Sequence, residues 1–171
     1  MRVGGGEKRT PWSVALTGSG SKWETELGDD KTCMPAPDFL DTNVLVYAYD
    51  ESAPAKQRVA QDLVRKAVAG ELIISAQVLA EFAATLLHKL TPPAAPDDVL
   101  AILDALAPIK VISPDGELVR RAVEARVKYR LHVYDAMIVA AAERGGCQRI
   151  WSEDLNEGQQ YFGSTVANPF R

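Results

Sequence analysis

Short apolar runs alternate with amphipathic stretches from Phe39 onward. The runs at 72–75 (LIIS), 110–113 (KVIS) and 148–151 (QRIW) are typical of buried strands, and 39–43 (FLDTN) predicts a strand that ends in a turn. Apolar residues at helical spacing predict a helix over 54–69, which starts at Pro54 and stops at Gly70. Further helices are predicted over 77–90, 97–106, 115–130 and 134–143, with helix or loop over 44–49 and a further candidate strand at 164–167.

Strands and helices therefore alternate along most of the chain. Short, continuous apolar strands separated by helices indicate a parallel sheet with helices on both of its faces. We expect an α/β fold, a three-layer sandwich around a central, mainly parallel sheet.

The first 36 residues differ from the rest in composition. They are rich in Gly, Ser, Thr and charged residues and show neither a helical nor a strand period. We expect a disordered or misannotated N-terminal extension over 1–36, with Met34 as a sensible start, and one domain over 37–171. An interaction arm is the alternative interpretation of the extension.

Composition narrows the function classes. The chain has 171 residues, which suits one domain, and its two cysteines, Cys33 and Cys147, lie far apart, which argues against a zinc site and a disulfide scaffold. No transmembrane span or signal peptide is evident, so we expect a cytoplasmic protein without membrane contact. The net charge of −4 disfavours a simple nucleic-acid binder but permits an enzyme that meets phosphate through bound cations.

Four acidic residues are predicted to meet at one edge of the sheet. Asp41 ends the first strand and Asp154 follows the strand at 148–151. Ligands of open α/β sheets bind outside the carboxyl ends of the strands, and helices of βα units begin at the same edge. Asp135 opens one helix, and Glu81 is expected in about the first turn of another.

Each acid also has a purely structural interpretation. Asp41 and Asp135 could cap helices, Glu81 could favour a helix dipole, and Asp154 could form a turn. However, Asp41, Glu81 and Asp135 are flanked by apolar residues, and burying several unpaired carboxylates together is costly. A divalent cation removes this cost, and oxygen ligands favour Mg²⁺ or Mn²⁺ over zinc.

The segments FLDTNVLVYA, VLAEFAATL, YDAMIVAAA and WSEDLNEGQ, in this order, resemble the four motifs of PIN-domain ribonucleases. The likeness covers about 38–171 and is greatest to the VapC-type toxins of type II toxin–antitoxin systems. It implies that Asp41, Glu81, Asp135 and Asp154 are the catalytic, metal-binding acids, supported by Asn43 and Ser152. Asn43 as a helix cap and Ser152 as a strand-end hydrogen-bonding residue remain alternatives, and Glu153 competes with Asp154 for the fourth position.

The resemblance also implies a function. It predicts a Mg²⁺- or Mn²⁺-dependent endoribonuclease that hydrolyses RNA phosphodiesters. It also predicts that the chain is the toxin of a toxin–antitoxin pair, bound by a cognate antitoxin protein, and that it forms a homodimer. A non-catalytic PIN-like module that binds RNA or protein is the alternative. The basic residues at 120–130 are either phosphate contacts or a solvated helix face. His132 is a less favoured neighbour of the site. The apolar residues of the first two helices either form a surface for partners or belong to the core.

Overall fold

The computed structural model describes residues 36–90 and 92–171, so the expectation for the N-terminal extension concerns residues that lie outside the description. The helices are α1 (Thr42–Tyr47), α2 (Pro54–Val68), α3 (Ala76–His88), α4 (Pro96–Leu106), α5 (Gly116–Tyr129) and α6 (Val133–Arg144). The strands are β1 (Asp38–Leu40), β2 (Leu72–Ser75), β3 (Lys110–Ile112), β4 (Arg149–Trp151), β5 (Gln160–Tyr161) and β6 (Ser164–Ala167).

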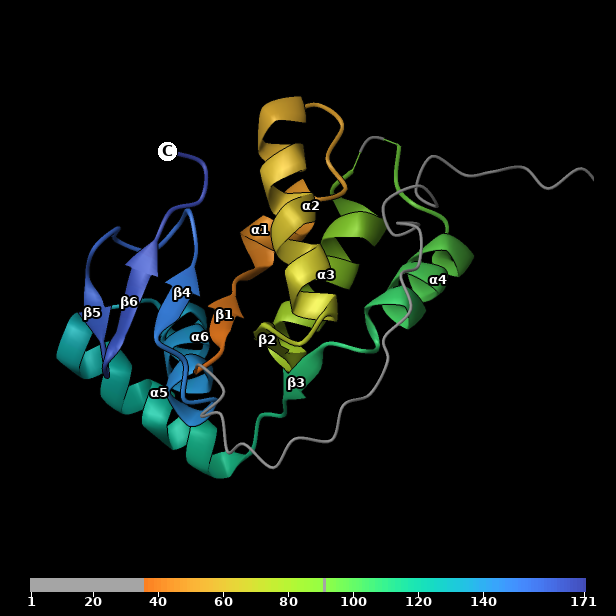
Figure 1. Cartoon of the computed structure of the whole chain (residues 1–171). Helices are drawn as coiled ribbons and strands as arrows, with labels where there is room; N and C mark the ends of the chain where they lie inside the picture. The colour runs from red at the N-terminus through yellow and green to blue at the C-terminus, as the bar shows by residue number, and fades with distance from the viewer. Residues whose placement is uncertain (1–35, 91) are drawn as a thin grey trace, which may run out of the picture.

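The strands form one sheet in the order β3-β2-β1-β4-β6-β5 (Figure 1). Every neighbouring pair is parallel except β5 and β6, which are antiparallel. The predicted mainly parallel sheet is therefore confirmed. The short strand β5 was not predicted, because two residues are too few to show a period of alternation.

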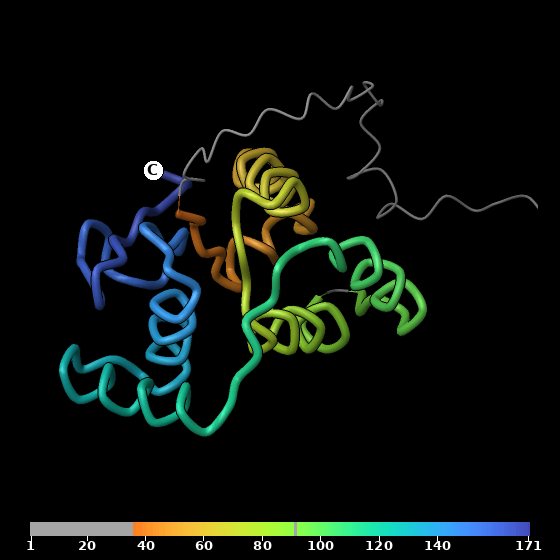
Figure 2. The backbone as a smooth tube through the Cα atoms, turned by 60° about the horizontal axis from the view of Figure 1, so that its bottom comes forward, coloured from red at the N-terminus to blue at the C-terminus, as the bar shows by residue number. Residues whose placement is uncertain are grey.

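Helices cover both faces of the sheet. Figures 1 and 2 show α2 on one side of the sheet and α5 and α6 on the other, as the three-layer prediction requires. Helix α6 is buried from Ile138 to Ala142, and its run of alanines lets the helix backbone approach the sheet closely. No helix in the described ranges has both the length and the apolar character needed to cross a membrane.

The centre of the sheet is apolar and holds the functional edge in place. Phe39 lies beside Ile73 of β2 and Ile150 of β4, and all three side chains are buried. One residue beyond β1, the backbone N–H of Asp41 donates to the carbonyl of Trp151 at 3.1 Å. The carboxyl ends of β1 and β4 are thereby tied together, and the loops that follow them share one edge of the molecule.

Candidate acidic active site

Asp41 is a buried carboxylate at the junction between β1 and α1. It is the N-cap residue of α1, and its Oδ1 accepts from the backbone N–H of Thr42 at 2.6 Å. Only 8% of its surface is exposed. Burial raises the pKa of Asp41 to about 6, and hydrogen bonds from Ser152 and Thr42 oppose this rise, whereas the charges of Asp154 and Glu81 add to it.

Asn43 and Ser152 join Asp41 to Asp154. The Ser152 hydroxyl donates to Oδ2 of Asp41 at 2.6 Å, and the Asn43 amide donates to the same oxygen and to Oδ2 of Asp154, each at 3.1 Å. Ser152 Oγ also accepts from the backbone N–H groups of Asp154 and Leu155. Because Asp41 caps α1, Asn43 does not, and the cap alternative for Asn43 is wrong.

Glu81 reaches the same edge from α3. Its Oε2 accepts from the Thr42 hydroxyl at 3.0 Å, and its Oε1 accepts from the amide of Gln77 at 2.7 Å. The prediction that Glu81 lies in about the first turn is wrong by one turn, because Ser75 caps α3 and the helix begins at Ala76. Gln77 and Glu81 are four residues apart in α3 and therefore lie on the same face of the helix.

Asp135 lies in the first turn of α6 and is partly buried. The N-cap residue is His132, so Asp135 does not cap the helix. Burial raises the pKa of Asp135, and the charges of Asp154 and Glu81 raise it further, whereas the charge of His132 lowers it. His132 is therefore within electrostatic reach of the acids, which the sequence favoured only weakly.

The structure brings the four predicted acids into one electrostatic neighbourhood. Asp41 and Asp135 each feel the charges of both Glu81 and Asp154. A cleft of about 550 Å³ opens at this edge, and its lining includes Glu81 and Asp154. A cap, dipole or turn role for each acid does not explain why four carboxylates from separate elements gather at one edge of the sheet, where their charges repel one another.

Two polar residues of the site were missed from the sequence. Thr42 holds Glu81 through its hydroxyl, and Gln77 donates both to Glu81 and to the carbonyl of Tyr134, the residue before Asp135. Gln77 thus links α3 to α6, while its own Oε1 is buried without a hydrogen-bond partner in the described structure. The spacing of Gln77 and Glu81 on one helix face was the available signal.

Comparison with known proteins places this site in a family. The family model described as "PIN domain" matches residues 39–157, which contain all four acids. The chain belongs to the PIN domain family. A solved structure with a similar fold is that of VapBC2 from Rickettsia felis bound to a DNA fragment from their promoter, with a TM-score of 0.53 and 18% sequence identity over 76% of this chain and 96% of that chain. The comparison with curated proteins gives no match.

In this PIN domain, Glu153 and Asp154 are used differently. Both oxygens of Glu153 accept from Nζ of Lys56, at 2.5 and 2.8 Å, and this ion pair lowers the pKa of Glu153. Asp154 instead accepts from Asn43, which also holds Asp41. The two neighbours point to different partners, and Asp154 shares the acidic network whereas Glu153 fastens its loop to α2.

The four carboxylates of this PIN domain are the type of ligand that a hard divalent cation prefers, although they are not arranged as a formed metal site. Within the part of the chain that the structure describes, no three His, Cys, Asp or Glu side chains are grouped as a formed metal site. Both oxygens of Asp41 and of Glu81 are turned toward protein donors. All four candidate ligands are nevertheless carboxylates, and Asp41 is buried without a cationic partner among the described residues, which a divalent ion would supply.

The basic residues of α5 are largely occupied. Arg121 pairs with Glu143 and Glu124, and the Arg121 guanidinium lies 3.6 Å from the centre of the Phe162 ring. Arg126 donates to the carbonyl of Leu131, and Arg130 ends the helix with a positive φ of 58°. These contacts favour the interpretation of a structural, solvated helix face over that of a phosphate-binding cluster.

Proposed function

We propose that this PIN domain is a Mg²⁺- or Mn²⁺-dependent endoribonuclease that hydrolyses RNA phosphodiesters. The observation that carries the proposal is the buried carboxylate of Asp41 at an edge shared with three further acids. Burial raises the pKa of both Asp41 and Asp135, and the charges of Glu81 and Asp154 raise it further. A fold that keeps these charges together gains most when a cation binds between them.

Asp41, Glu81, Asp135 and Asp154 would hold the metal. When bound, a divalent ion activates a water molecule and stabilises negative charge on the phosphate. The surrounding residues orient the ligands. Asn43 and Ser152 fix Asp41 relative to Asp154, while Thr42 and Gln77 fix Glu81.

The biological role that we propose is that of the toxin of a toxin–antitoxin pair. It rests on the motif resemblance and on the fold similarity to VapBC2. The chain would then act in the cytoplasm, form a homodimer and bind a cognate antitoxin protein.

The apolar residues of α1 and α2 that were considered as partner surface are largely buried, for example Leu45 and Leu63. In contrast, Val119, Val123 and Val127 are exposed on α5.

The test is cleavage of a labelled single-stranded RNA by the purified chain. We expect cleavage with Mg²⁺ or Mn²⁺, none with a chelator, and a loss of roughly 10²-fold in Asp135→Asn, because one carboxylate fewer stabilises the cation and the charge that develops on the phosphate. Metal binding measured by calorimetry separates this from a non-catalytic module. A chain that binds RNA, but neither binds metal nor cleaves the RNA, would support the non-catalytic alternative.

A paired substitution tests which neighbour belongs to the acidic network. Asp154→Asn should lose roughly 10²-fold in cleavage rate, because it removes a charge from the proposed cation site. Glu153→Gln should stay within a few-fold of the native rate and lose at most about 1 kcal/mol of stability, since its ion pair with Lys56 is partly exposed. Cleavage rates and urea unfolding measure both effects. Equal losses of activity in the two variants would contradict the assignment.

A further inference from the structure

Lys89 is the basic side chain of the acidic cleft. It is the C-cap residue of α3, is exposed to solvent and lines the cleft together with Thr42, Glu81 and Asp154. The cleft lining holds no other Lys or Arg from the described ranges. A positive charge at the rim of an acidic site would attract a polyanion that the rest of the chain, with its net charge of −4, repels.

The ammonium group of Lys89 is available for an external anion. It takes part in none of the ion pairs formed by the described residues. Lys56, in contrast, is bound by Glu153 and the Tyr47 hydroxyl, and Arg121 is bound by two glutamates. A lysine without an ion-pair partner keeps three N–H donors for a ligand.

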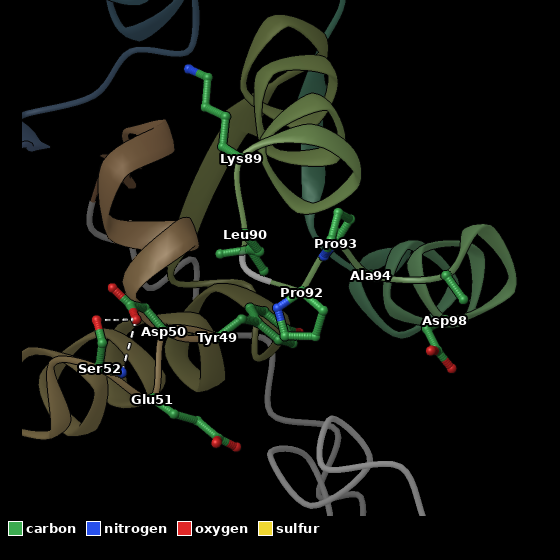
Figure 3. A pocket seen from close by; sticks show the side chains of 11 residues that line it. Tyr49, Asp50, Glu51, Ser52, Lys89, Leu90, Pro92, Pro93, Ala94 and Asp98 are labelled. Carbon is green, nitrogen blue, oxygen red and sulfur yellow. Dashed lines mark hydrogen bonds between the residues drawn. The ribbon is translucent and has the colours of Figure 1, made fainter.

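Lys89 also stands where two hollows meet. A second hollow of about 800 Å³ lies between the loop after α1 and the loop after α3, and both Asp50 and Lys89 line it as well as the acidic cleft. Figure 3 shows the Lys89 side chain extending away from Leu90 and Pro92, which belong to the wall of this second hollow. A strand that leaves the acidic cleft on this side therefore passes the ammonium group.

We propose that Lys89 binds a backbone phosphate of the single-stranded RNA substrate beside the phosphodiester that is cut. The inference rests on the proposed nuclease function and adds a binding residue to it. Lysine meets phosphate as a compact point charge, so the contact holds the strand in register without reading its sequence. The contact also offsets part of the repulsion between the strand and the four carboxylates.

The test is the affinity of a short fluorescein-labelled RNA for the full chain, measured by anisotropy at several salt concentrations in a chelator, so that the strand stays intact. Lys89→Gln should weaken binding by about tenfold at low salt, since a charged hydrogen bond is lost. It should also reduce the slope of log K against log salt concentration by about 0.7, the value for one phosphate of a single strand. Lys89→Arg should keep most of the affinity and the slope.

Lys66 provides the matched control. It is exposed in the last turn of α2, where its carbonyl accepts from the N–H of Glu71, just before β2, and so it lies at the opposite edge of the sheet from the acids. Lys66→Gln should bind RNA as the native chain does. Equal affinity and slope in Lys89→Gln and Lys66→Gln would overturn the Lys89 contact, even if the native chain cleaves RNA with metal. Binding that depends on Lys89 without cleavage would instead uphold the contact and overturn the nuclease. A native chain that neither binds RNA in the chelator nor cleaves it with metal would overturn both.

Discussion

Asp41→Asn is expected to lose at least about 10³-fold in RNA cleavage while remaining folded. Asparagine keeps an oxygen that can accept from the Thr42 N–H, but it carries no charge for a cation. Its amide would also face the Ser152 hydroxyl and the Asn43 amide, which both donate at this position. The substitution therefore removes a buried metal ligand and disturbs the link to Asp154 at once.

Single-turnover cleavage rates with saturating Mn²⁺ measure this effect, and circular dichroism checks the fold. Asp50→Asn is the matched control, because Asp50 lines the same cleft but accepts only from Ser52 among the described residues. It removes one negative charge from the cleft without touching the four acids, so its rate should stay within a few-fold of native. Native-like cleavage by Asp41→Asn would mean that the acidic edge is not the catalytic site.

The second large effect concerns stability without metal. Folding raises the pKa of Asp41 from 3.8 to about 6, so the folded state holds this proton more tightly than the unfolded state. The associated stability is fully present below about pH 4 and is lost as the pH rises through 6. The loss amounts to about 3 kcal/mol at neutral pH and above.

Urea unfolding of the native chain and of Asp41→Asn in a chelator, across this pH range, measures the loss. Other titrating groups are common to both chains, so the difference between their free energies of unfolding isolates Asp41. We expect this difference to shift by about 3 kcal/mol against the native chain between about pH 4 and pH 8. Mg²⁺ should restore stability on the alkaline side, because the ion binds the charged carboxylate. A difference that does not change with pH would show that Asp41 titrates normally.

Much of the fold could be predicted from the chain because its elements carry strong local signals. Continuous apolar runs such as LIIS are typical of buried strands, and Pro54 and Gly70 mark the ends of a helix. Alternation of the two element types then predicts a parallel sheet. Strand β5 has no such signal, because it is held by its pairing with β6 rather than by a pattern of its own.

The acids could likewise be assigned to one edge from their positions next to strand ends and helix starts, since sheet topology fixes where those ends lie. The sequence could not show which donors each carboxylate meets. Thr42 and Gln77 hold Glu81 across α1 and α3, and Asn43, which also holds Asp41, donates to Asp154 across 111 residues of sequence. Glu153 and Asp154 are adjacent in the chain, and the positions of Lys56 on α2 and Asn43 on α1 separate their roles.

The sequence alone determined the α/β class, the order of most elements and the edge at which Asp41, Glu81, Asp135 and Asp154 would gather, because apolar periodicity and chain direction are local properties. Tertiary structure decided the hydrogen-bond partners, the burial that raises the pKa of Asp41, the ion pairs of Arg121 on α5, and the position of Lys89, which has no ion-pair partner among the described residues. These depend on distances between elements that are remote in the sequence, and such distances are set only when the core packs.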